Sequence, residues 1–263
     1  MLQRALRSLR DGLLGLAYPQ QCRVCQGPVE SWDYGVVCGV CWDDPTITKI
    51  LSGNVCSKCG APFAPITDTA QCSAAANQSR RCGTCTSAPF TSARASGIYS
   101  GAFEASILFL KVTPHICPRL RGIICRTFSE HGDSLKGDVV IPVPLHRLRE
   151  KERGFNQAGI IARVISREFG LRFDDCSLIR IKPTERHRAG MDANDRFQSV
   201  ERAFELVDSK RIRGVSVLLV DDVYTTGSTI CAAARSLTEA GARQVNVLTI
   251  ARVGARAIGA QRH

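Results

Sequence analysis

The sequence predicts an α/β protein with a parallel sheet, preceded by a small N-terminal Cys-rich domain. Two observations lead to this fold class. After about residue 92, short aliphatic runs alternate with helical patterns, which is typical of parallel sheets. Between residues 22 and 85, closely spaced cysteines replace any apolar periodicity. We therefore expect an N-terminal amphipathic helix over 1–18, a double zinc ribbon over 19–90 and an α/β domain over 91–263.

Composition excludes several classes of protein. A hydrophobic content of 44% without long polar tracts excludes a mainly disordered chain. The longest apolar runs, 139–143 and 215–220, are far shorter than the roughly 20 residues of a membrane span. The apolar stretch 13–17 follows Asp11 in an Arg-rich segment and is unlike a secretory signal. We therefore expect a cytoplasmic protein whose cysteines bind metal rather than form disulfides.

The first 18 residues have helical periodicity. Four leucines lie three or four positions apart, and Pro19 follows as a stop signal: Leu2, Leu6, Leu9 and Leu13. The apolar stripe fits a helix that caps a neighbouring domain, which we favour. Docking on a membrane surface is the alternative.

Four C-x2-C pairs within 64 residues predict two zinc sites. Two intervening residues let both sulfurs of a tight turn face one ion, and Zn²⁺ takes four ligands. The pairs are Cys22/Cys25, Cys38/Cys41, Cys56/Cys59 and Cys82/Cys85. Sequential pairing gives a double zinc ribbon, and an interleaved arrangement is the alternative. Four thiolates leave no open position, so the predicted zinc is structural, and its binding would fold a segment with little core. Cys72 is left over and is interpreted as a free surface thiol.

The second part of the chain contains strand and helix patterns in alternation. Aliphatic runs predict strands at 139–141, 217–220 and 245–250. Asn156 is a candidate cap for a helix that ends at Gly170, with a predicted buried stripe of Ile161, Val164, Ile165 and Phe169. A second helix is expected after Ser228 and before Gly241, with Ile230, Ala233, Ala234 and Leu237 inward.

The most informative motif is VLLVDDVYTTGST, residues 217–229. It combines a buried strand, two acids, a Gly-containing turn and a helix start. Such a turn points backbone N–H groups of residues 226–229 into a concavity at the positive end of a helix dipole, which favours an anion. Asp221 and Asp222 would repel a phosphate in direct contact, but they can accept hydrogen bonds from sugar hydroxyls beside it. The motif therefore predicts a site for a ribose that carries a 5′-phosphate.

This motif resembles the phosphoribosyl-pyrophosphate signature of type I phosphoribosyltransferases. Three further stretches extend the resemblance: PVPLHRLREKERGFNQ (142–157), LKV (110–112) and RIKPTERHRAGMDANDRFQSVERAF (180–204). With the preceding zinc-ribbon cysteines, they resemble the ComF family of competence-associated, phosphoribosyltransferase-like proteins. The resemblance runs from about Tyr18 to Val253 and implies a type I phosphoribosyltransferase-like sheet of about five parallel strands.

The resemblance also implies roles for individual residues. The ligand would be phosphoribosyl pyrophosphate bound with Mg²⁺. Asp221 and Asp222 would hold its ribose 2′- and 3′-hydroxyls. Its 5′-phosphate would be held by Thr225, Thr226, Gly227, Ser228 and Thr229. The turn 142–146 would face the pyrophosphate, and the segment 180–204 would close over the site. Candidates for the pyrophosphate and its loop are Lys111, Pro144, His146, Arg147 and Arg153.

Three departures from the family pattern affect this interpretation. Val112 stands where an aromatic usually follows the Lys of the LK motif, and Arg188 stands where relatives commonly have Gln. Thr225 occupies the position of an Asp that acts as a base in purine-salvage enzymes, and a threonine cannot do so. The departure at Thr225 argues against 6-oxopurine salvage.

Two functions remain open on the sequence. The first is a phosphoribosyltransferase whose acceptor and catalytic residues are unidentified. The alternative is a non-catalytic protein of DNA uptake that binds single-stranded DNA or a competence helicase. The basic stretches 146–153 and 180–188 would then follow a nucleic-acid phosphate backbone, or they form an ordinary solvated surface. A zinc-dependent transcription factor is disfavoured, because no helix-turn-helix pattern accompanies the cysteines.

Overall fold

The computed structural model describes residues 20–63, 80–182 and 203–254, and every structural statement below refers to these ranges. Several predicted features lie outside them. They are the helix over 1–18, Cys72, and most of the segment 180–204, including Arg188.

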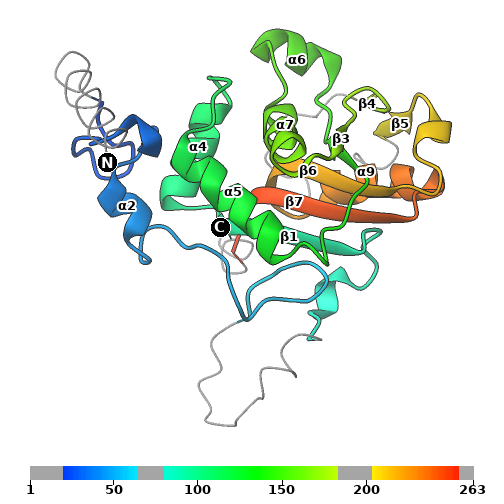
Figure 1. Ribbon diagram of the computed structural model, residues 1–263, viewed down its shortest axis with the longest axis horizontal. Helices are drawn as coiled ribbons and strands as arrows, with labels where there is room; N and C mark the ends of the chain where they lie inside the picture. The colour runs from blue at the N-terminus through cyan, green and yellow to red at the C-terminus, as the bar shows by residue number, and fades with distance from the viewer. Residues whose placement is uncertain (1–19, 64–79, 183–202, 255–263) are drawn as a thin grey trace, which may run out of the picture.

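The centre of the fold is a parallel sheet of five strands in the order β1-β7-β6-β2-β3 (Figure 1). The strands are β1 (Ser92–Ile98), β2 (Val139–Pro142), β3 (Arg172–Phe173), β6 (Ser216–Tyr224) and β7 (Gln244–Arg252). In the central pair, Ser216 lies opposite Gln244 and Tyr224 opposite Arg252. The predicted α/β class and its parallel sheet are therefore confirmed.

Helices cover both faces of the sheet. On one face, α4 (Gly101–Leu110), α5 (Pro118–Glu130) and α7 (Gln157–Phe169) pack against Leu218, Val220 and Leu248 (Figure 1). On the other face, α9 (Ser228–Glu239) packs against Val217, Leu219 and Val247. Alternate residues of β6 therefore point into two separate cores, as expected for a strand buried on both sides.

The predicted helix caps and most of the predicted core are confirmed. Asn156 caps α7 by accepting a hydrogen bond from the N–H of Ala158, and Gly170 ends the helix in the left-handed region. The four expected residues of α9 are all buried. Two predictions for α7 were inaccurate, because Val164 and Phe169 are only half-buried. Phe169 lies at the end of the helix and packs against Phe128, with 4.5 Å between ring centroids.

Strand β6 is longer than the sequence indicated. It continues four residues beyond Val220, because β7 extends beside it and pairs with Asp221, Val223 and Tyr224. Both aspartates therefore belong to the strand itself, near its carboxyl end, and their backbone is held by the sheet.

The cysteine-rich part forms two modules, and each of them packs into one of the two cores of the sheet. The first contains η1 (Trp32–Tyr34) and α2 (Gly39–Asp43), and its Trp42 packs edge-on against Phe103 of α4 at 5.8 Å. The second contains η2 (Gly83–Cys85) and joins the core on the α9 side. Between them, Leu51 donates a backbone hydrogen bond to Ser96 and Lys49 accepts one from Ile98. This connection covers part of the exposed edge of β1.

Two further features flank the sheet. Strands β4 (Leu178–Arg180) and β5 (Phe204–Leu206) form an antiparallel pair, and η3 (Ser209–Arg211) follows them. Helix α6 (Arg147–Arg153) has no buried residue and projects from one end of the molecule (Figure 1). None of the helices in the described ranges has the length and apolar character that a membrane crossing requires.

Candidate functional site

The turn between β6 and α9 presents a helix N-terminus and several hydroxyls to solvent. Gly227 adopts a φ of 83° and stands at the N-cap position of α9. The first helical bond runs from the N–H of Cys231 to the carbonyl of Gly227, so the N–H groups of Thr229 and Ile230 precede it. Thr226 is exposed, and its Oγ1 lies 2.9 Å from Oγ of Ser228. This arrangement suits an anionic group placed over the turn.

Thr226 also modifies the expected set of backbone donors. Its Oγ1 accepts a hydrogen bond from the N–H of Ser228 at 3.4 Å. That N–H was expected to face the anion directly. The hydroxyl of Thr226 therefore engages one of the backbone N–H groups that the sequence assigned to the anion.

Asp222 lies in a network of charged and polar side chains. Its Oδ2 is 3.7 Å from Nζ of Lys111, the residue that follows α4, and it accepts a hydrogen bond from Nε2 of Gln157 at 3.4 Å. Arg153 in turn donates to Oε1 of Gln157. Asp222 and Gln157 are buried, so the network fixes the direction of the carboxylate. Of the predicted pyrophosphate candidates, Lys111 thus lies beside the predicted ribose-binding acid, and Arg153 is connected to it through Gln157.

Asp221 is less well neutralised than Asp222. Its Oδ1 accepts a hydrogen bond from the N–H of Asp222 at 2.9 Å. Burial and, secondarily, the charge of Asp222 raise the pKa of Asp221 well above its usual value, although Lys111 and Arg180 oppose this. A ligand that donates hydroxyl hydrogen bonds, or a cation, would relieve the unfavourable charge.

The corner between α6 and α7 joins β2 to this network. Asn156 donates a hydrogen bond from Nδ2 to the carbonyl of Val143 at 3.0 Å while its Oδ1 caps α7. The next residue, Gln157, reaches Asp222. Sequence reasoning did not identify Gln157 as a site residue. The available signal was an amide in the buried first turn of a helix, directly after the predicted cap.

The other predicted pyrophosphate candidates lie around the turn after β2. His146 caps α6 by accepting a hydrogen bond at Nδ1 from the N–H of Leu148, at 3.4 Å, and pairs with Arg180 through a backbone bridge. Pro144 is half-buried and Arg147 is exposed. Arg180 was expected as the start of a loop and as part of a basic stretch, and its charge acts on Asp221.

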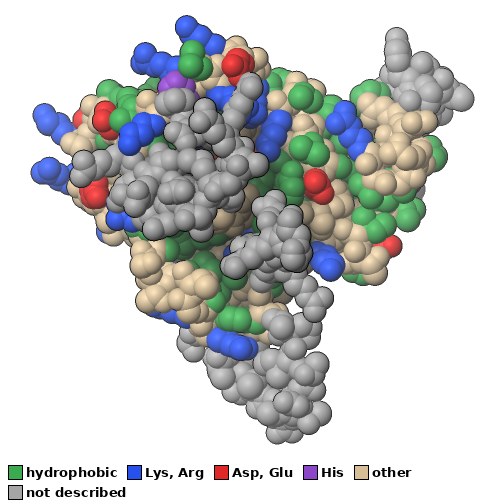
Figure 2. Space-filling view, turned by 180° about the vertical axis from the view of Figure 1, so that it is seen from behind, with side chains coloured by type: hydrophobic (Ala, Val, Ile, Leu, Met, Phe, Trp, Pro, Cys, Tyr) green, Lys and Arg blue, Asp and Glu red, His purple; other side chains and the backbone are tan. Residues whose placement is uncertain are grey.

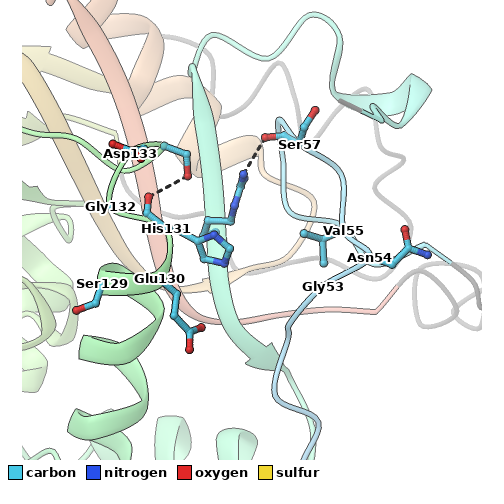
Figure 3. Close-up of a pocket in the computed structure, with 11 residues that line it drawn as sticks. Gly53, Asn54, Val55, Ser57, Ser129, Glu130, His131, Gly132 and Asp133 are labelled. Carbon is cyan, nitrogen blue, oxygen red and sulfur yellow. Dashed lines mark hydrogen bonds between the residues drawn. The ribbon is translucent and has the colours of Figure 1, made fainter. Parts of the chain in front are cut away.

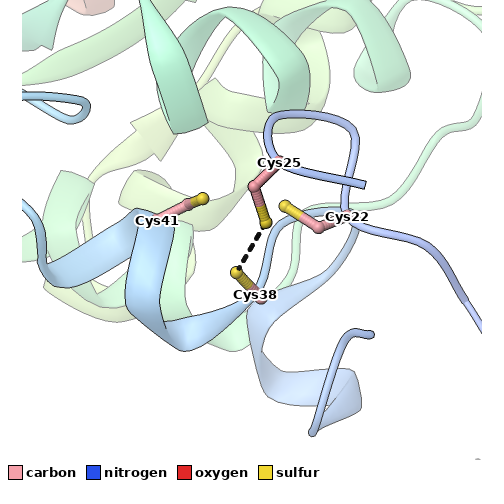
Figure 4. Close-up of side chains that lie close together, drawn as sticks. All are labelled: Cys22, Cys25, Cys38 and Cys41. Carbon is pink, nitrogen blue, oxygen red and sulfur yellow. Dashed lines mark hydrogen bonds between the residues drawn. The ribbon is translucent and has the colours of Figure 1, made fainter. Parts of the chain in front are cut away.

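The eight paired cysteines form two clusters, and the sequential pairing is confirmed. The first is Cys22, Cys25, Cys38 and Cys41 (Figure 4), and the second is Cys56, Cys59, Cys82 and Cys85. Within each cluster all sulfurs lie within 4.8 Å of one another. Cys25 and Cys38 are 3.6 Å apart, and Cys59 and Cys82 are 3.4 Å apart. Zn–S bonds of about 2.3 Å in a tetrahedron place sulfurs about 3.8 Å apart, so both clusters fit zinc.

The two clusters are built from the same backbone turn. In the first, Cys22 donates to the carbonyl of Gly27 and accepts from the N–H of Gln26. In the second, Cys56 donates to Ala61 and accepts from Gly60 in the same way. Backbone N–H groups also point at the sulfurs, as Val24 does at Cys22 and Cys82 at Cys56. Such bonds favour the thiolate form that a metal requires.

The charges in each cluster also favour a bound cation. Burial opposes ionisation of Cys22, but nearby backbone N–H groups outweigh it and lower the pKa of Cys22 to about 6. Burial and the neighbouring thiols raise the pKa of Cys41 far above its usual value. Cys82 and Cys85 repeat this division, with the pKa of Cys82 lowered to about 6 and that of Cys85 raised. Four thiolates are therefore incompatible without positive charge between them, and Zn²⁺ would supply it.

Comparison with known proteins identifies the family. Residues 125–260, about half of the chain, match the family described as phosphoribosyl transferase domain. "Competence protein F" of Haemophilus influenzae is 37% identical over 116 residues, which are 44% of this chain and 50% of that protein. "Competence protein ComFC" of Bacillus subtilis is 35% identical over 118 residues, which are 43% of this chain and 44% of that protein. The chain belongs to the ComF family.

Further relatives and solved structures are also similar to this chain. The ComF-family chain is 27% identical to "DNA utilization protein YhgH" of Salmonella typhimurium over 244 residues, which are 90% of this chain and 99% of that protein. Among solved structures, orotate phosphoribosyltransferase of Mycobacterium tuberculosis has 20% identity and a TM-score of 0.33, with 64% of this chain and 76% of that chain covered. The glutamine phosphoribosylpyrophosphate amidotransferase of B. subtilis has 19% identity and a TM-score of 0.34, with coverage of 57% and 27%.

Two surface hollows lie outside the site of this ComF-family protein. The larger, of about 870 Å³, lies between residues 53–57 and the end of α5, where Arg94 of β1 donates to the carbonyl of Ser57 (Figure 3). Because Arg94 is near the start of a parallel strand, this hollow is toward the opposite edge of the sheet from the turn 225–229. The smaller, of about 200 Å³, lies between α5 and α7 and is lined by Arg121, Arg163 and Arg167.

Proposed function

We propose that this ComF-family protein binds phosphoribosyl pyrophosphate with Mg²⁺ over the turn 225–229 and acts as a phosphoribosyltransferase. The observation that carries the proposal is the combination of an exposed helix N-terminus, lined with hydroxyls, and a carboxylate pair on the preceding strand. The turn accounts for a 5′-phosphate, and the acids account for the ribose hydroxyls next to it. The phosphoribosyl transferase domain match supports the same ligand class.

The residues around the carboxylates suit the charge changes of such a reaction. Nζ of Lys111 lies 3.7 Å from Oδ2 of Asp222, and Arg153 donates a hydrogen bond to Gln157. When the bond between C1 of the ribose and the pyrophosphate breaks, negative charge accumulates on the leaving group. Fixed cations beside it stabilise that charge. Mg²⁺ would neutralise pyrophosphate oxygens and, since it keeps mostly water and substrate ligands, needs few ligands from the protein.

Calorimetric titration of the zinc-loaded protein tests the proposal. Phosphoribosyl pyrophosphate with Mg²⁺ is expected to bind the wild type, and the D221A/D222A double variant is expected to show no measurable binding. D175A is the matched control, because Asp175 is an acid paired with Arg163 on another part of the surface. Absence of binding by the wild type, or retained binding by the double variant, would refute the site. Release of pyrophosphate upon addition of candidate acceptors separates an enzyme from a binding protein.

A second function is favoured by the distribution of positive charge. Helix α6 exposes Arg147, Arg149 and Lys151 to solvent, and Lys and Arg side chains gather at the corresponding edge of the molecule (Figure 2). The smaller hollow between α5 and α7 is also lined by arginines, of which Arg121 pairs with Glu168 and Arg163 with Asp175. We propose these surfaces as contacts for a single-stranded nucleic-acid backbone, either beside the sugar-phosphate site or in place of its catalytic use. The Salmonella relative is named a DNA utilization protein, which is consistent with such contacts.

The salt dependence of oligonucleotide binding tests the second function. For single strands, each neutralised phosphate contributes about −0.7 to the slope of log K against log salt concentration. The R147E/R149E/K151E variant loses three cations, so the absolute value of that slope should be about 2 smaller than for the wild type. D221A/D222A should leave the slope unchanged. Equal slopes for the wild type and the α6 variant would show that α6 makes no backbone contacts.

A further inference from the structure

Tyr224 forms the support beneath the phosphate-binding turn. It is the last residue of β6, and its ring lies directly against Gly227. A Cβ atom at Gly227 would be 2.5 Å from Oη of Tyr224 and 2.7 Å from its Cζ. Only glycine therefore fits above the ring, and a shift of the ring would move the turn.

The same ring is held from below by Arg252 and Phe90. The guanidinium of Arg252 lies 5.0 Å from the ring centroid of Tyr224, within the range of a cation–π contact. Phe90 packs edge-on against the ring at 6.3 Å and 85°. Tyr224 and Arg252 are also paired in the register of β6 and β7. These contacts fix the ring in one position.

Arg252 connects this support to the second cysteine cluster. Its Nη1 donates a hydrogen bond of 2.6 Å to the carbonyl of Cys59, and the residue is 8% exposed. A buried guanidinium is costly unless a negative charge lies nearby. Four thiolates around one Zn²⁺ carry a net charge of minus two, and Arg252 lies beside Cys59 in that cluster. The metal-loaded cluster thus supplies the counter-charge that keeps Arg252 in place.

We propose that Tyr224 and Arg252 are positioning residues that couple zinc binding at the Cys56–Cys85 cluster to sugar-phosphate binding at the turn 225–229. The inference rests on the proposed function for the identity of the ligand at the turn. Without zinc, the carbonyl of Cys59 and the local negative charge lose their fixed positions, Arg252 is released, and the support under Gly227 loosens. By thermodynamic linkage, the sugar phosphate then strengthens zinc binding at this cluster by the same factor.

The first cysteine cluster provides the internal control. Its cysteines pack with α4 and α5 on the opposite face of the sheet, where Phe103 and Cys117 join the same core. Within the described ranges, no hydrogen bond, ion pair or ring contact joins that cluster to Tyr224, Arg252 or Gly227. Zinc at the first cluster should therefore stabilise the protein without affecting the turn specifically.

The experiment measures ribose 5-phosphate binding to the full chain by calorimetry, at saturating zinc and in four variants. C82S disrupts the second cluster, and C25S disrupts the first at a residue with no greater burial. R252M removes the guanidinium without touching a zinc ligand. R94M removes another arginine beside the second cluster. The guanidinium of Arg94 donates hydrogen bonds to the carbonyls of Ala93 and Ser57. We expect C82S and R252M to weaken binding about 5-fold or more, and C25S and R94M by less than about 2-fold.

A second measurement separates positioning from simple loss of structure. Zinc affinity at the second cluster is determined with a competing chelator, with and without ribose 5-phosphate. The ligand should raise zinc affinity in the wild type and in Y224F, which keeps the ring, but not in R252M or Y224L. The coupling would be overturned if C82S and C25S weakened ribose 5-phosphate binding equally, or if the ligand raised the zinc affinity of R252M as it does that of the wild type. Either result would leave the proposed ligand of the turn unaffected. If the wild type binds neither ribose 5-phosphate nor phosphoribosyl pyrophosphate, the proposed function and the coupling are both refuted.

Discussion

Lys111 Nζ lies 3.7 Å from Oδ2 of Asp222, although the two residues are separated by more than a hundred positions in the chain. The contact joins the end of α4 to the carboxyl end of β6. It gives the LKV stretch a physical role, because the lysine adjoins the acid proposed to hold the ribose. A cation in that place can serve either the acid or the pyrophosphate of a bound ligand.

Substitution of Lys111 distinguishes these two roles. If Lys111 contacts pyrophosphate, K111M should weaken phosphoribosyl pyrophosphate about 10-fold, the effect of losing one charge-assisted hydrogen bond, and ribose 5-phosphate much less. Titration calorimetry with both ligands measures the difference. Equal losses for the two ligands would mean that Lys111 only orients Asp222. Lys136, which is exposed and pairs with Asp133, provides the control variant K136M.

Gln157 should be important for stability as well as for the site. The Q157L variant removes the amide that bridges Arg153 and the buried Asp222. A buried acceptor that loses a partner costs about 1–3 kcal/mol, so the free energy of unfolding should fall by that amount in a urea titration. Q244L is the matched amide control, because the side chain of Gln244 donates a long hydrogen bond of 3.5 Å to the carbonyl of Lys136. This substitution should change the free energy of unfolding by less than about 0.5 kcal/mol. An unchanged midpoint for Q157L would contradict a structural role for the bridge.

The elements of the fold were predictable where a local pattern determines them. The aliphatic runs at 139–141 and 245–250 became β2 and β7, and the Asn156 cap and the Gly170 stop delimit α7 as expected. The turn 225–229 before α9 was also predictable, since its Gly, its hydroxyls and the helix start are contiguous. In each case the necessary residues lie within about fifteen positions, so no knowledge of tertiary contacts was required.

The remaining features depend on contacts between distant segments. Nothing near Gln157 indicates that it reaches Asp222, and nothing near Arg252 indicates that it reaches Cys59. The extension of β6 to Tyr224 depends on pairing with β7, whose length is set elsewhere. The cysteine modules were expected to have little core of their own, yet Trp42 and Phe90 bury them against opposite faces of the sheet. Periodicity within a segment carries no information about such partners.

The charged carboxylate of Asp221 is expected to lower the stability of the free protein while it serves ligand binding. Its pKa is raised, chiefly by burial, so the folded state holds a proton more tightly than the unfolded chain. Stability from this group is therefore present below the unfolded pKa of about 4 and is lost as pH rises through the raised pKa. D221N removes the penalty, and a gain of about 1 kcal/mol at pH 7 should raise the melting temperature by about 2–4 °C.

The pH dependence of D221N provides the check. The difference in melting temperature from the wild type should shrink toward zero as pH approaches about 4, where the wild-type carboxyl is protonated. Ribose 5-phosphate binding to the wild type should also weaken as pH falls through the raised pKa. D133N, at an exposed carboxylate paired with Lys136, should show neither effect. A D221N protein that is less stable than the wild type at pH 7 would show that the carboxylate is well compensated in the folded state.

Zinc removal should destabilise the whole described structure rather than two detached modules. Trp42 and Phe103 pack together across the boundary of the first module. Gly35 lies so close to Cys117, the residue before α5, that a Cβ at Gly35 would be 2.9 Å from that side chain. The second module contributes Cys56, Cys59 and Cys85 to the core that contains α9. Calorimetric melting before and after chelation should therefore show one transition that moves to lower temperature. Two equivalents of zinc should be released, and C176S, which alters an exposed thiol outside both clusters, should leave the transition in place. An unchanged main transition with a separate, lower one for the cysteine modules would mean that these shared contacts contribute little to stability.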